Sequence, residues 1–245
     1  MTNRGGKGSL AGLSVSVIMP CFNEAATVEI QLQRVLAAAA CGLKLEVLVV
    51  DDGSLDGSAE IVSRLVKQAG CLKLIRHERN LGKGAALRSA LRVASGDVIL
   101  IQDADLEYDP SEYPRLLAPI ARGAADVVYG SRFRGGDEVR ALYFWHSVAN
   151  RMLTFLANMF IDLNLTDIET GLKAFRRDVI SRIELRENRF GFEVEVTAKI
   201  ARLRPKPCFF EVGISYHGRT YNEGKKIGLR DALRALYCIL RYSVL

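Results

Sequence analysis

The sequence predicts an α/β fold with a doubly wound, mostly parallel sheet. Five apolar runs lack the polar alternation of half-exposed strands and are typical of strands covered on both faces. They occupy residues 15–19, 45–50, 72–75, 98–101 and 127–129. Helical patterns separate them at residues 25–40, 57–68, 83–94 and 111–122. Because strand and helix alternate, the connections are expected to be right-handed crossovers within one sheet.

Length and patterning predict one large domain with an appendage. The 245 residues suffice for a sizeable core. We expect residues 1–12 to be a flexible N-terminus, residues 13–226 to form the domain, and residues 227–245 to form a separate amphipathic helix. The sequence gives no indication of the oligomeric state.

The charge of the chain favours anionic partners. There are 34 Lys and Arg against 28 Asp and Glu, a formal net charge of +6. Nucleotide phosphates and anionic lipid headgroups are therefore plausible partners. Nucleic acid is the least favoured, because the sequence has no zinc spacing, long basic tract or aromatic RNA-stacking motif.

Cysteine and hydropathy patterns predict a reducing compartment. Five scattered cysteines without C-x-x-C spacing indicate neither a disulfide framework nor a zinc site. We find no signal-peptide core and no stretch of about 18 uncharged apolar residues, the length that a membrane span needs. The sequence thus predicts a cytoplasmic protein that meets a membrane, if at all, from its surface.

An acidic ladder ends the fourth predicted strand. In "VILIQDADLEYDP", residues 98–110, acids occupy every second position: Asp103, Asp105, Glu107 and Asp109. Side chains at i and i+2 of an extended segment point to the same side, so these charges would repel one another. A divalent cation would turn the repulsion into coordination. A polar turn without a metal is the alternative.

The segments after the other strands carry weaker signals. Ligands of such sheets bind beyond the carboxyl ends of the strands. In "DDGSLDGS", Asp51 and Asp52 could accept hydrogen bonds from a ribose or a base, or could belong to a turn that caps the next helix. In "LGKG", Lys83 opens a predicted helix, where a phosphate contact and a flexible turn are both possible.

These segments, in this order and spacing, resemble a family-2 glycosyltransferase of the GT-A fold. The similarity includes "SVIMPCFNEAATV", "VLVVDDGSLDGS", "RNLGKGAALRSAL" and "ADVVYGSR". It continues through "DIETGLKAFRRDVI" and "FGFEVEVTAKIAR" to the tail after residue 212. That tail is similar to the dolichyl-phosphate glucosyltransferase and mannose synthase group. The resemblance covers nearly the whole chain from residue 14.

The resemblance implies a set of site residues. Asp103 and Asp105 would hold Mg²⁺ or Mn²⁺ on the donor diphosphate, with Glu107 where mannose synthases often have Gln. The implied contacts to the nucleotide sugar are Pro20, Phe22, Glu24, Asp51, Asp52, Lys83, Ala104, Arg219 and Lys225. The last two match the basic residues that clamp the donor pyrophosphate. Residues 216–228 favour UDP-glucose over GDP-mannose by resemblance only.

Two amphipathic stretches predict contact with lipid. In residues 139–161 the polar side chains share one narrow helical face, while the opposite side is apolar. They are Arg140, Ser147, Arg151, Thr154 and Asn158. In residues 227–245 a leucine stripe lies beside arginines. Both stretches suit helices on an anionic membrane surface, the first with its polar face toward the site. Packing against the domain is the alternative in each case.

The expected reaction is inverting, metal-dependent transfer of a hexose from UDP-glucose or GDP-mannose to a polyprenyl or dolichyl phosphate. A phosphate monoester arrives already ionised, so the acceptor needs cations rather than a base. Arg132, Arg140 and Ser147 are the residues we predict for that cradle. Arg132 could instead pair with a structural acid.

Three other functions stay open. A family-2 transferase that uses a soluble or polysaccharide hydroxyl would need a base, for which Glu193 or Asp167 is the best placed by motif. These two and Glu195 could bind sugar hydroxyls or give structural support. A non-catalytic nucleotide-binding protein at the membrane surface is disfavoured by the intact acidic ladder. A sugar-1-phosphate nucleotidyltransferase is disfavoured because its Gly-rich, Arg-containing start is absent.

Overall fold

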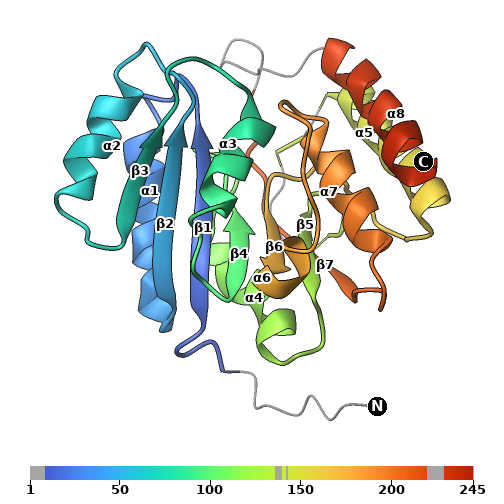
Figure 1. The fold of residues 1–245 in the computed structure, drawn as a ribbon, viewed down its shortest axis with the longest axis horizontal. Coiled ribbons are helices and arrows are strands. Elements are labelled where there is room, and N and C mark those ends of the chain that lie inside the picture. The colour runs from blue at the N-terminus through green and yellow to red at the C-terminus, as the bar shows by residue number, and fades with distance from the viewer. Residues whose placement is uncertain (1–8, 136–139, 142, 220–228, 245) are drawn as a thin grey trace.

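Seven strands form one twisted sheet in a computed structural model that describes residues 9–135, 140–141, 143–219 and 229–244 (Figure 1). The strands are β1 (Ser14–Cys21), β2 (Lys44–Asp51), β3 (Leu72–Arg76), β4 (Val98–Ile101), β5 (Val127–Ser131), β6 (Lys173–Arg176) and β7 (Phe209–Gly213). The five predicted strands are confirmed. Most of the predicted flexible N-terminus, residues 1–8, and Lys225 lie outside the described residues.

The sheet is doubly wound, as predicted, with one exception in direction. Its order is β3-β2-β1-β4-β6-β5-β7. β6 runs antiparallel to β4 and β5, and the other pairs are parallel. The carboxyl ends of β1 to β5 therefore open on the same edge of the sheet.

Helices cover both faces of the sheet. One face carries α1 (Val28–Ala37), α2 (Ser58–Val66) and α4 (Tyr113–Ala121), with the short 3-10 helices η1 (Ala38–Cys41) and η2 (Pro110–Glu112). The other face carries α3 (Lys83–Leu91), α6 (Arg177–Ile180) and α7 (Phe192–Ala201). α1 buries Val28, Leu32 and Val35, at the spacing of one helical face. Such packing positions the segments that leave the sheet edge.

A third core lies away from the sheet. α5 (Phe144–Ile161) and α8 (Leu229–Val244) lie side by side and pack on α7 (Figure 1). Leu153, Ala157 and Ile161 of α5 meet Ala235 and Ile239 of α8 in this core. No helix within the described ranges has both the length and the apolar character to cross a bilayer.

The sequence did not predict β6 and β7. β6 has four residues and begins with Lys173, which is completely buried. Its ammonium group meets the Glu193 carboxylate and the carbonyl of Thr170. A buried lysine is tolerated in a strand only when such partners are present, and the carboxylate comes from another element, α7.

Candidate active site

Asp52 organises the edge of the sheet after β2. Its carboxylate accepts hydrogen bonds from the backbone N–H groups of Leu81 (3.0 Å) and Gly82 (2.7 Å), and it lies 2.6 Å from Nδ1 of His77. Gly82 has a φ of 100°, and a side chain there would collide with the carbonyl of Asn188. Asp52 thus fixes the approach to α3. His77 was not predicted, although it follows a predicted strand directly.

Asp51 lines a pocket that we call the β2 pocket. The pocket measures about 400 Å³, within the usual range for small-molecule sites. Its walls are Asp51, Gly53, Ser54, Leu55, Arg76, His77 and Glu78. The Asp51 side chain is buried, and its Oδ1 has no hydrogen-bond partner within the described part of the chain. A ligand with an N–H or O–H donor would satisfy that oxygen.

Three of the residues predicted to contact the nucleotide sugar are apolar, and they differ in burial. Pro20 ends β1, is partly buried and stands in register with Val50 of β2. Phe22 follows that strand and is also partly buried. Ala104 is buried in the main core. The Ala104 side chain is therefore part of the core rather than of an open ligand surface.

A chain of alternating charges lies beside the acidic ladder. Nζ of Lys83 is 2.8 Å from Asp103 and 3.0 Å from Glu193, and Glu193 also contacts the buried Lys173. Burial opposes the positive charge of Lys83, but the two carboxylates outweigh it and raise its pKa. The same cations hold the pKa of Glu193 below its usual value against the effect of burial. Lys83 was predicted to contact a phosphate and here neutralises two acids.

Arg219 gathers three acids from distant segments. Its guanidinium lies 2.7 Å from Asp105, 3.1 Å from Glu24 and 3.6 Å from Glu107. The backbone N–H of Arg219 also donates to Glu107 over 2.8 Å. We call these residues, with Lys83, Asp103, Lys173 and Glu193, the charge cluster. The prediction that Arg219 and Glu24 share a site with the ladder is consistent with these contacts.

The three predicted metal ligands do not converge as a ready-made set. In the described ranges no group of three or more His, Cys, Asp or Glu side chains has metal-binding geometry, because Lys83 engages Asp103 and Arg219 engages Asp105 and Glu107. Their chemistry nevertheless suits a hard cation. Burial, then the charges of Asp103 and Glu107, raises the pKa of Asp105 to about 8 despite Arg219. A cation could be held if these carboxylates exchanged their present partners for it.

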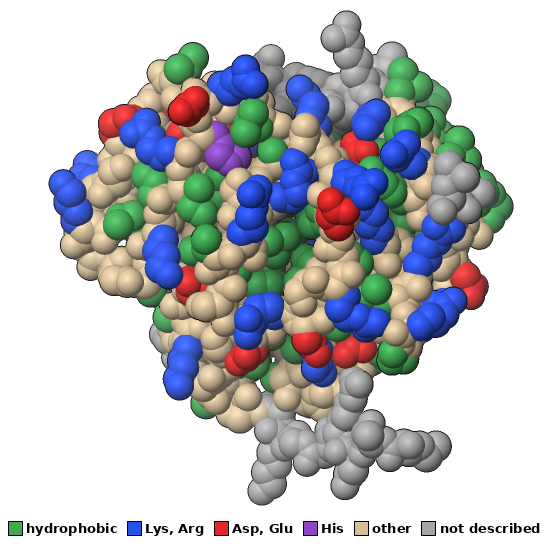
Figure 2. Space-filling view, in the orientation of Figure 1, with side chains coloured by type: hydrophobic (Ala, Val, Ile, Leu, Met, Phe, Trp, Pro, Cys, Tyr) green, Lys and Arg blue, Asp and Glu red, His purple; other side chains and the backbone are tan. Residues whose placement is uncertain are grey.

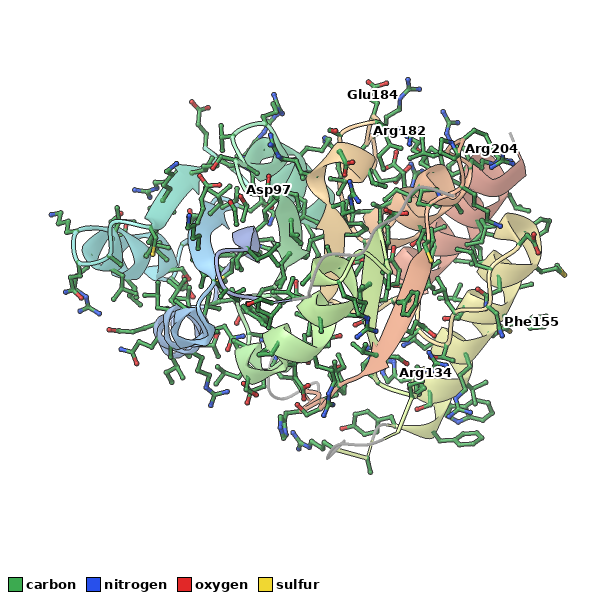
Figure 3. The ribbon with its side chains drawn as sticks, turned by 90° about the horizontal axis from the view of Figure 1, so that it is seen from below. Asp97, Arg134, Phe155, Arg182, Glu184 and Arg204 are labelled. Atoms are coloured by element: carbon green, nitrogen blue, oxygen red, sulfur yellow. The ribbon has the colours of Figure 1, made fainter. Side chains whose placement is uncertain are left out.

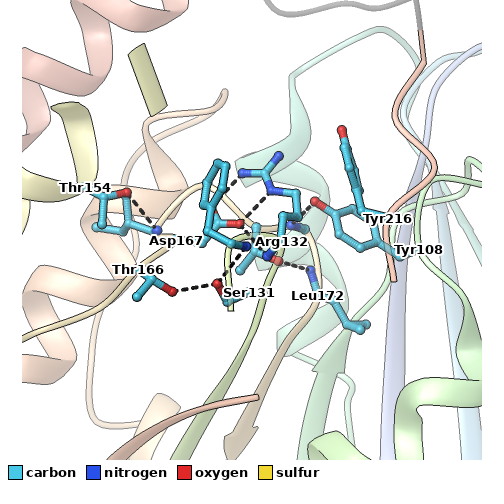
Figure 4. A network of polar contacts seen from close by, with 12 residues as sticks. Tyr108, Ser131, Arg132, Thr154, Thr166, Asp167, Leu172 and Tyr216 are labelled. Carbon is cyan, nitrogen blue, oxygen red and sulfur yellow. Dashed lines mark hydrogen bonds and ion pairs between the residues drawn. The ribbon is translucent and has the colours of Figure 1, made fainter. Parts of the chain in front are cut away.

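Arg132 and Asp167 form a buried ion pair (Figure 4). Nε and one terminal nitrogen of Arg132 each lie 2.6 Å from an oxygen of Asp167, the bidentate geometry that guanidinium favours. The guanidinium also lies 5.1 Å from the ring centre of Tyr216. The alternative that Arg132 pairs with a structural acid is thus realised, although this contact does not test an additional role toward a ligand.

Arg140 was predicted to lie on the helix of residues 139–161, but it precedes the observed helix, because α5 begins only at Phe144. Its backbone N–H donates to the carbonyl of Tyr216, and its side chain donates to the carbonyl of Gly218. A second pocket, of about 450 Å³, is lined by Arg140, Glu24 and Arg219 among others. Arg140 therefore borders the charge cluster.

Part of the predicted polar stripe of α5 faces inward: Thr154 is buried and Asn158 partly buried, whereas Arg151 is exposed. The Thr154 hydroxyl accepts the backbone N–H of Ile168, next to Asp167 (Figure 4). The Asn158 side-chain amide donates to the carbonyl of Leu165 and accepts its backbone N–H. Ser147 lies in the first turn and is partly buried. The stripe therefore supports the segment that carries Asp167.

The opposite side of α5 carries large apolar side chains in contact with solvent. Trp145 is 76% exposed and Phe155 66%, and Phe155 points away from the domain in Figure 3. The other exposed apolar residues of this surface are Phe144, Val148, Met152, Met159 and Phe160 on α5 with Leu233, Tyr237 and Leu240 on α8. We call it the α5–α8 apolar surface, and Figure 2 shows hydrophobic side chains gathered over these helices. Large apolar side chains exposed on two packed helices differ from the singly scattered apolar exposure that is normal on a soluble surface.

Glu187 ties α8 to the edge of the site. Its carboxylate pairs with Arg234 at 2.9 Å and accepts the hydroxyl of Tyr242. Its backbone carbonyl packs against Gly84 and accepts a hydrogen bond from Arg88 of α3. One residue thus links α8 to the helix that Lys83 opens.

Glu195 has a structural position. It is fully buried and accepts the backbone N–H groups of Arg186 and Glu187 at 2.7 and 2.8 Å. Lys199 lies 2.6 Å from the same carboxylate. The sequence left two roles open for Glu195, and these contacts are those of structural support rather than of sugar binding.

The chain belongs to glycosyl transferase family 2. The model of that family, "Glycosyl transferase family 2", matches residues 16–184. The chain is 30% identical to a dolichol-phosphate mannosyltransferase of Pyrococcus furiosus, over 94% of this chain and 65% of that protein. It is also 30% identical to an undecaprenyl-phosphate mannosyltransferase of Micrococcus luteus, over 88% of each. It thus spans slightly less than two thirds of the length of the archaeal relative.

Solved structures support the fold. A glucosyl-3-phosphoglycerate synthase of Mycobacterium tuberculosis, crystallised with Mn²⁺ and UDP-glucose, superimposes with a TM-score of 0.73 at 19% identity, over 95% of this chain and 79% of that chain. The predicted GT-A fold is thereby confirmed.

Proposed function

We propose that this chain transfers a hexose, with inversion, from a nucleotide sugar to a polyprenyl or dolichyl phosphate at the cytoplasmic surface of a membrane. The observation that carries the proposal is the orientation of α5, on which Thr154 supports the segment of Asp167 while large apolar side chains such as Trp145 and Phe155 are exposed. A helix of this kind suits a protein that lies on a bilayer and receives a lipid substrate there.

Relatives support the acceptor class more strongly than the donor. The two mannosyltransferases are named for dolichol and undecaprenyl phosphate, and a relative from Rhizobium johnstonii, 26% identical, is a dodecaprenyl-phosphate galacturonate synthase. The prenyl phosphate is common to these names, whereas the sugar varies. UDP-glucose and GDP-mannose are the donors that we propose, with UDP-glucose preferred from the resemblance of residues 216–228.

The β2 pocket and the charge cluster would share the donor. The pocket would receive the nucleoside, with Asp51 accepting a hydrogen bond. Asp103, Asp105 and Glu107 would hold Mg²⁺ or Mn²⁺, which when bound supplies positive charge to the leaving diphosphate. Arg219, once free of these carboxylates, would pair with the diphosphate, and we propose the same role for Lys225.

Arg132, Arg140 and Ser147 would position the acceptor phosphate. The ionised acceptor needs no general base. The carboxylates suggested as bases for a hydroxyl acceptor are already engaged, Asp167 by Arg132 and Glu193 by two lysines. This engagement favours the phosphate acceptor over a soluble hydroxyl.

The decisive experiment is a transfer assay with a panel of radiolabelled nucleotide sugars, polyprenyl phosphate and Mn²⁺ or Mg²⁺. We expect label in the organic phase with one donor, and loss of that label when the cation is chelated. Label only in water-soluble products would support the hydroxyl-acceptor alternative. Absence of transfer with every donor would contradict the proposal.

Membrane docking is tested by binding to vesicles that contain anionic lipid. Exchange of Trp145 and Phe155 for Ser should weaken vesicle binding about tenfold or more, because the buried apolar area is lost. The melting temperature should hardly change, since both side chains are exposed. Ile30→Ser on α1, also an exposed apolar residue, is the matched control and should bind as the wild type does.

A further inference from the structure

Glu169 has a buried oxygen that nothing in the described part of the chain satisfies. Oε1 of its carboxylate is enclosed and has no hydrogen-bond partner there, although the residue as a whole is partly exposed. Leaving a buried polar atom unpaired costs free energy. Such an atom in a candidate site needs a hydrogen-bond donor, which a ligand hydroxyl group could supply.

The neighbours of Glu169 place it between the two ends of the proposed reaction. Two residues earlier, Asp167 holds Arg132. Two residues later, Gly171 lies so close to Asp103 that a side chain at that glycine would collide with the carboxylate. Glu169 therefore lies on a short segment that runs from the proposed acceptor side, Arg132, to the proposed diphosphate side, Asp103.

The charge of Glu169 is incompletely compensated. Burial, followed by the negative charge of Glu193, raises the pKa of Glu169 to about 7, against the opposing effect of Lys173 and Arg132. The fold therefore places a carboxyl group at a position where its charged form is unfavourable. The other acids on either side of this segment have cationic partners: Asp103 has Lys83, and Asp167 has Arg132.

We infer that Glu169 recognises the transferred sugar by accepting a hydrogen bond from one or more of its hydroxyl groups at Oε1. The inference rests on the proposed function, since the sugar lies between its leaving diphosphate and the attacking phosphate. Sugar hydroxyls are hydrogen-bond donors, and a carboxylate is a strong acceptor. Glu169 is then a specificity-determining residue, and the reaction needs no proton transfer from it.

The test measures whether Glu169 interacts with one particular hydroxyl group of the donor sugar. The nucleotide sugar that the wild type uses best is compared with its 2-, 3-, 4- and 6-deoxy analogues, in the wild type and in Glu169→Ala and Glu169→Gln. We expect Glu169→Ala to lower kcat/KM for the parent sugar about tenfold to a hundredfold. For the wild type, kcat/KM for one of the deoxy analogues should be lower than for the parent sugar by a similar factor. For Glu169→Ala, kcat/KM for the same analogue should be lower by less than about threefold, because the interaction that the analogue lacks is already absent.

Calorimetry separates this role from a structural one. The affinity of Glu169→Ala for the nucleoside diphosphate alone should stay within about twofold of the wild type, while its affinity for the nucleotide sugar falls. Glu184→Gln, a surface acid with 77% side-chain exposure, is the control and should show neither change. Uniform losses over all analogues, or equal loss of nucleoside diphosphate affinity, would overturn the inference. These binding measurements need no acceptor, so failure of the lipid transfer assay would be recognised separately.

Discussion

The β2 pocket and the charge cluster adjoin the same sheet edge but are held together by different bonds. Around the β2 pocket, Asp52 uses backbone N–H groups and one histidine, all within residues 52–82. In the charge cluster, long side chains pair across the chain, as Arg219 does with Glu24 and Asp105. A backbone network keeps its shape without a ligand, whereas side-chain ion pairs can exchange partners. In the proposed function, the region held by backbone hydrogen bonds binds the nucleoside, and the region held by side-chain ion pairs surrounds the bond that breaks.

The largest effect is expected in the charge cluster. Asp103→Asn should lower transfer about a thousandfold, because a neutral amide is a poor ligand for the proposed cation. The fold should persist, since Lys83 keeps Glu193 as a partner. Turnover of labelled sugar and a thermal melt measure both. Asp109→Asn, in the same acidic run, is the control and should stay active. An active Asp103→Asn variant would end the metal assignment.

The next effect concerns the acceptor. Arg132→Lys cannot keep the two-pronged contact with Asp167, so kcat/KM for polyprenyl phosphate should fall about a hundredfold. KM for the nucleotide sugar should change less than about threefold. Steady-state kinetics with each substrate varied in turn measure the two values. Arg134→Lys, an exposed neighbour, should behave as wild type. If the donor KM rises instead, Arg132 belongs with the diphosphate.

Changes beside the β2 pocket should affect affinity rather than turnover. Asp52→Asn replaces one of the two carboxylate oxygens by an NH2 group, so one of the backbone N–H groups of Leu81 and Gly82 loses its acceptor, and nucleoside diphosphate binding should weaken about tenfold. Titration calorimetry measures the affinity, and kcat at saturating donor should stay near the wild-type value. Asp97→Asn, at the opposite edge of the sheet, is the control. A fall in kcat at unchanged affinity would contradict the assignment of this region.

The smallest effect on transfer is expected from Glu46, near the amino ends of the strands. Burial opposes its charge, but hydrogen bonds from Ser16, Ser95 and Lys73 prevail and lower its pKa to about 2. Glu46→Gln should reduce the free energy of unfolding by about 2 kcal/mol at pH 7 and leave kcat unchanged. A carboxyl group with a lowered pKa stabilises the folded state at pH values above its pKa in the unfolded chain. The difference in free energy of unfolding between wild type and Glu46→Gln should therefore shrink as the pH falls from about 4.5 to 2. Denaturant melts that show a constant difference over this range would contradict it.

Contiguous motifs made part of this molecule predictable. The five apolar runs and their alternation with helices are local patterns, and the five strands that they predicted are present. The metal site predicted from the acidic ladder stays a prediction. β6 was missed because Lys173 interrupts the apolar pattern, and its compensation by Glu193 arises only in the folded chain. Glu169 was missed for the same reason, since only the tertiary structure leaves its oxygen without a partner.

The two sides of α5 illustrate a further limit of sequence reasoning. Periodicity predicted a polar stripe directed toward the site, but it could not predict that Thr154 is buried while Arg151 is exposed. The start of the helix at Phe144 excludes Arg140 from the stripe. The direction of the stripe depends on contacts such as that of Thr154 with Ile168, which lie beyond the helix itself.

The double attachment of Glu187 has a practical consequence for handling this protein. Deleting α8 to improve solubility would remove Arg234 and Tyr242, and would leave the carboxylate unpaired at the point where the chain touches Gly84. Such a truncation would disturb the start of α3, and the resulting loss of activity would be mistaken for a requirement for lipid. Single exchanges of outward side chains such as Leu233 and Leu240 would lessen stickiness and keep that junction whole.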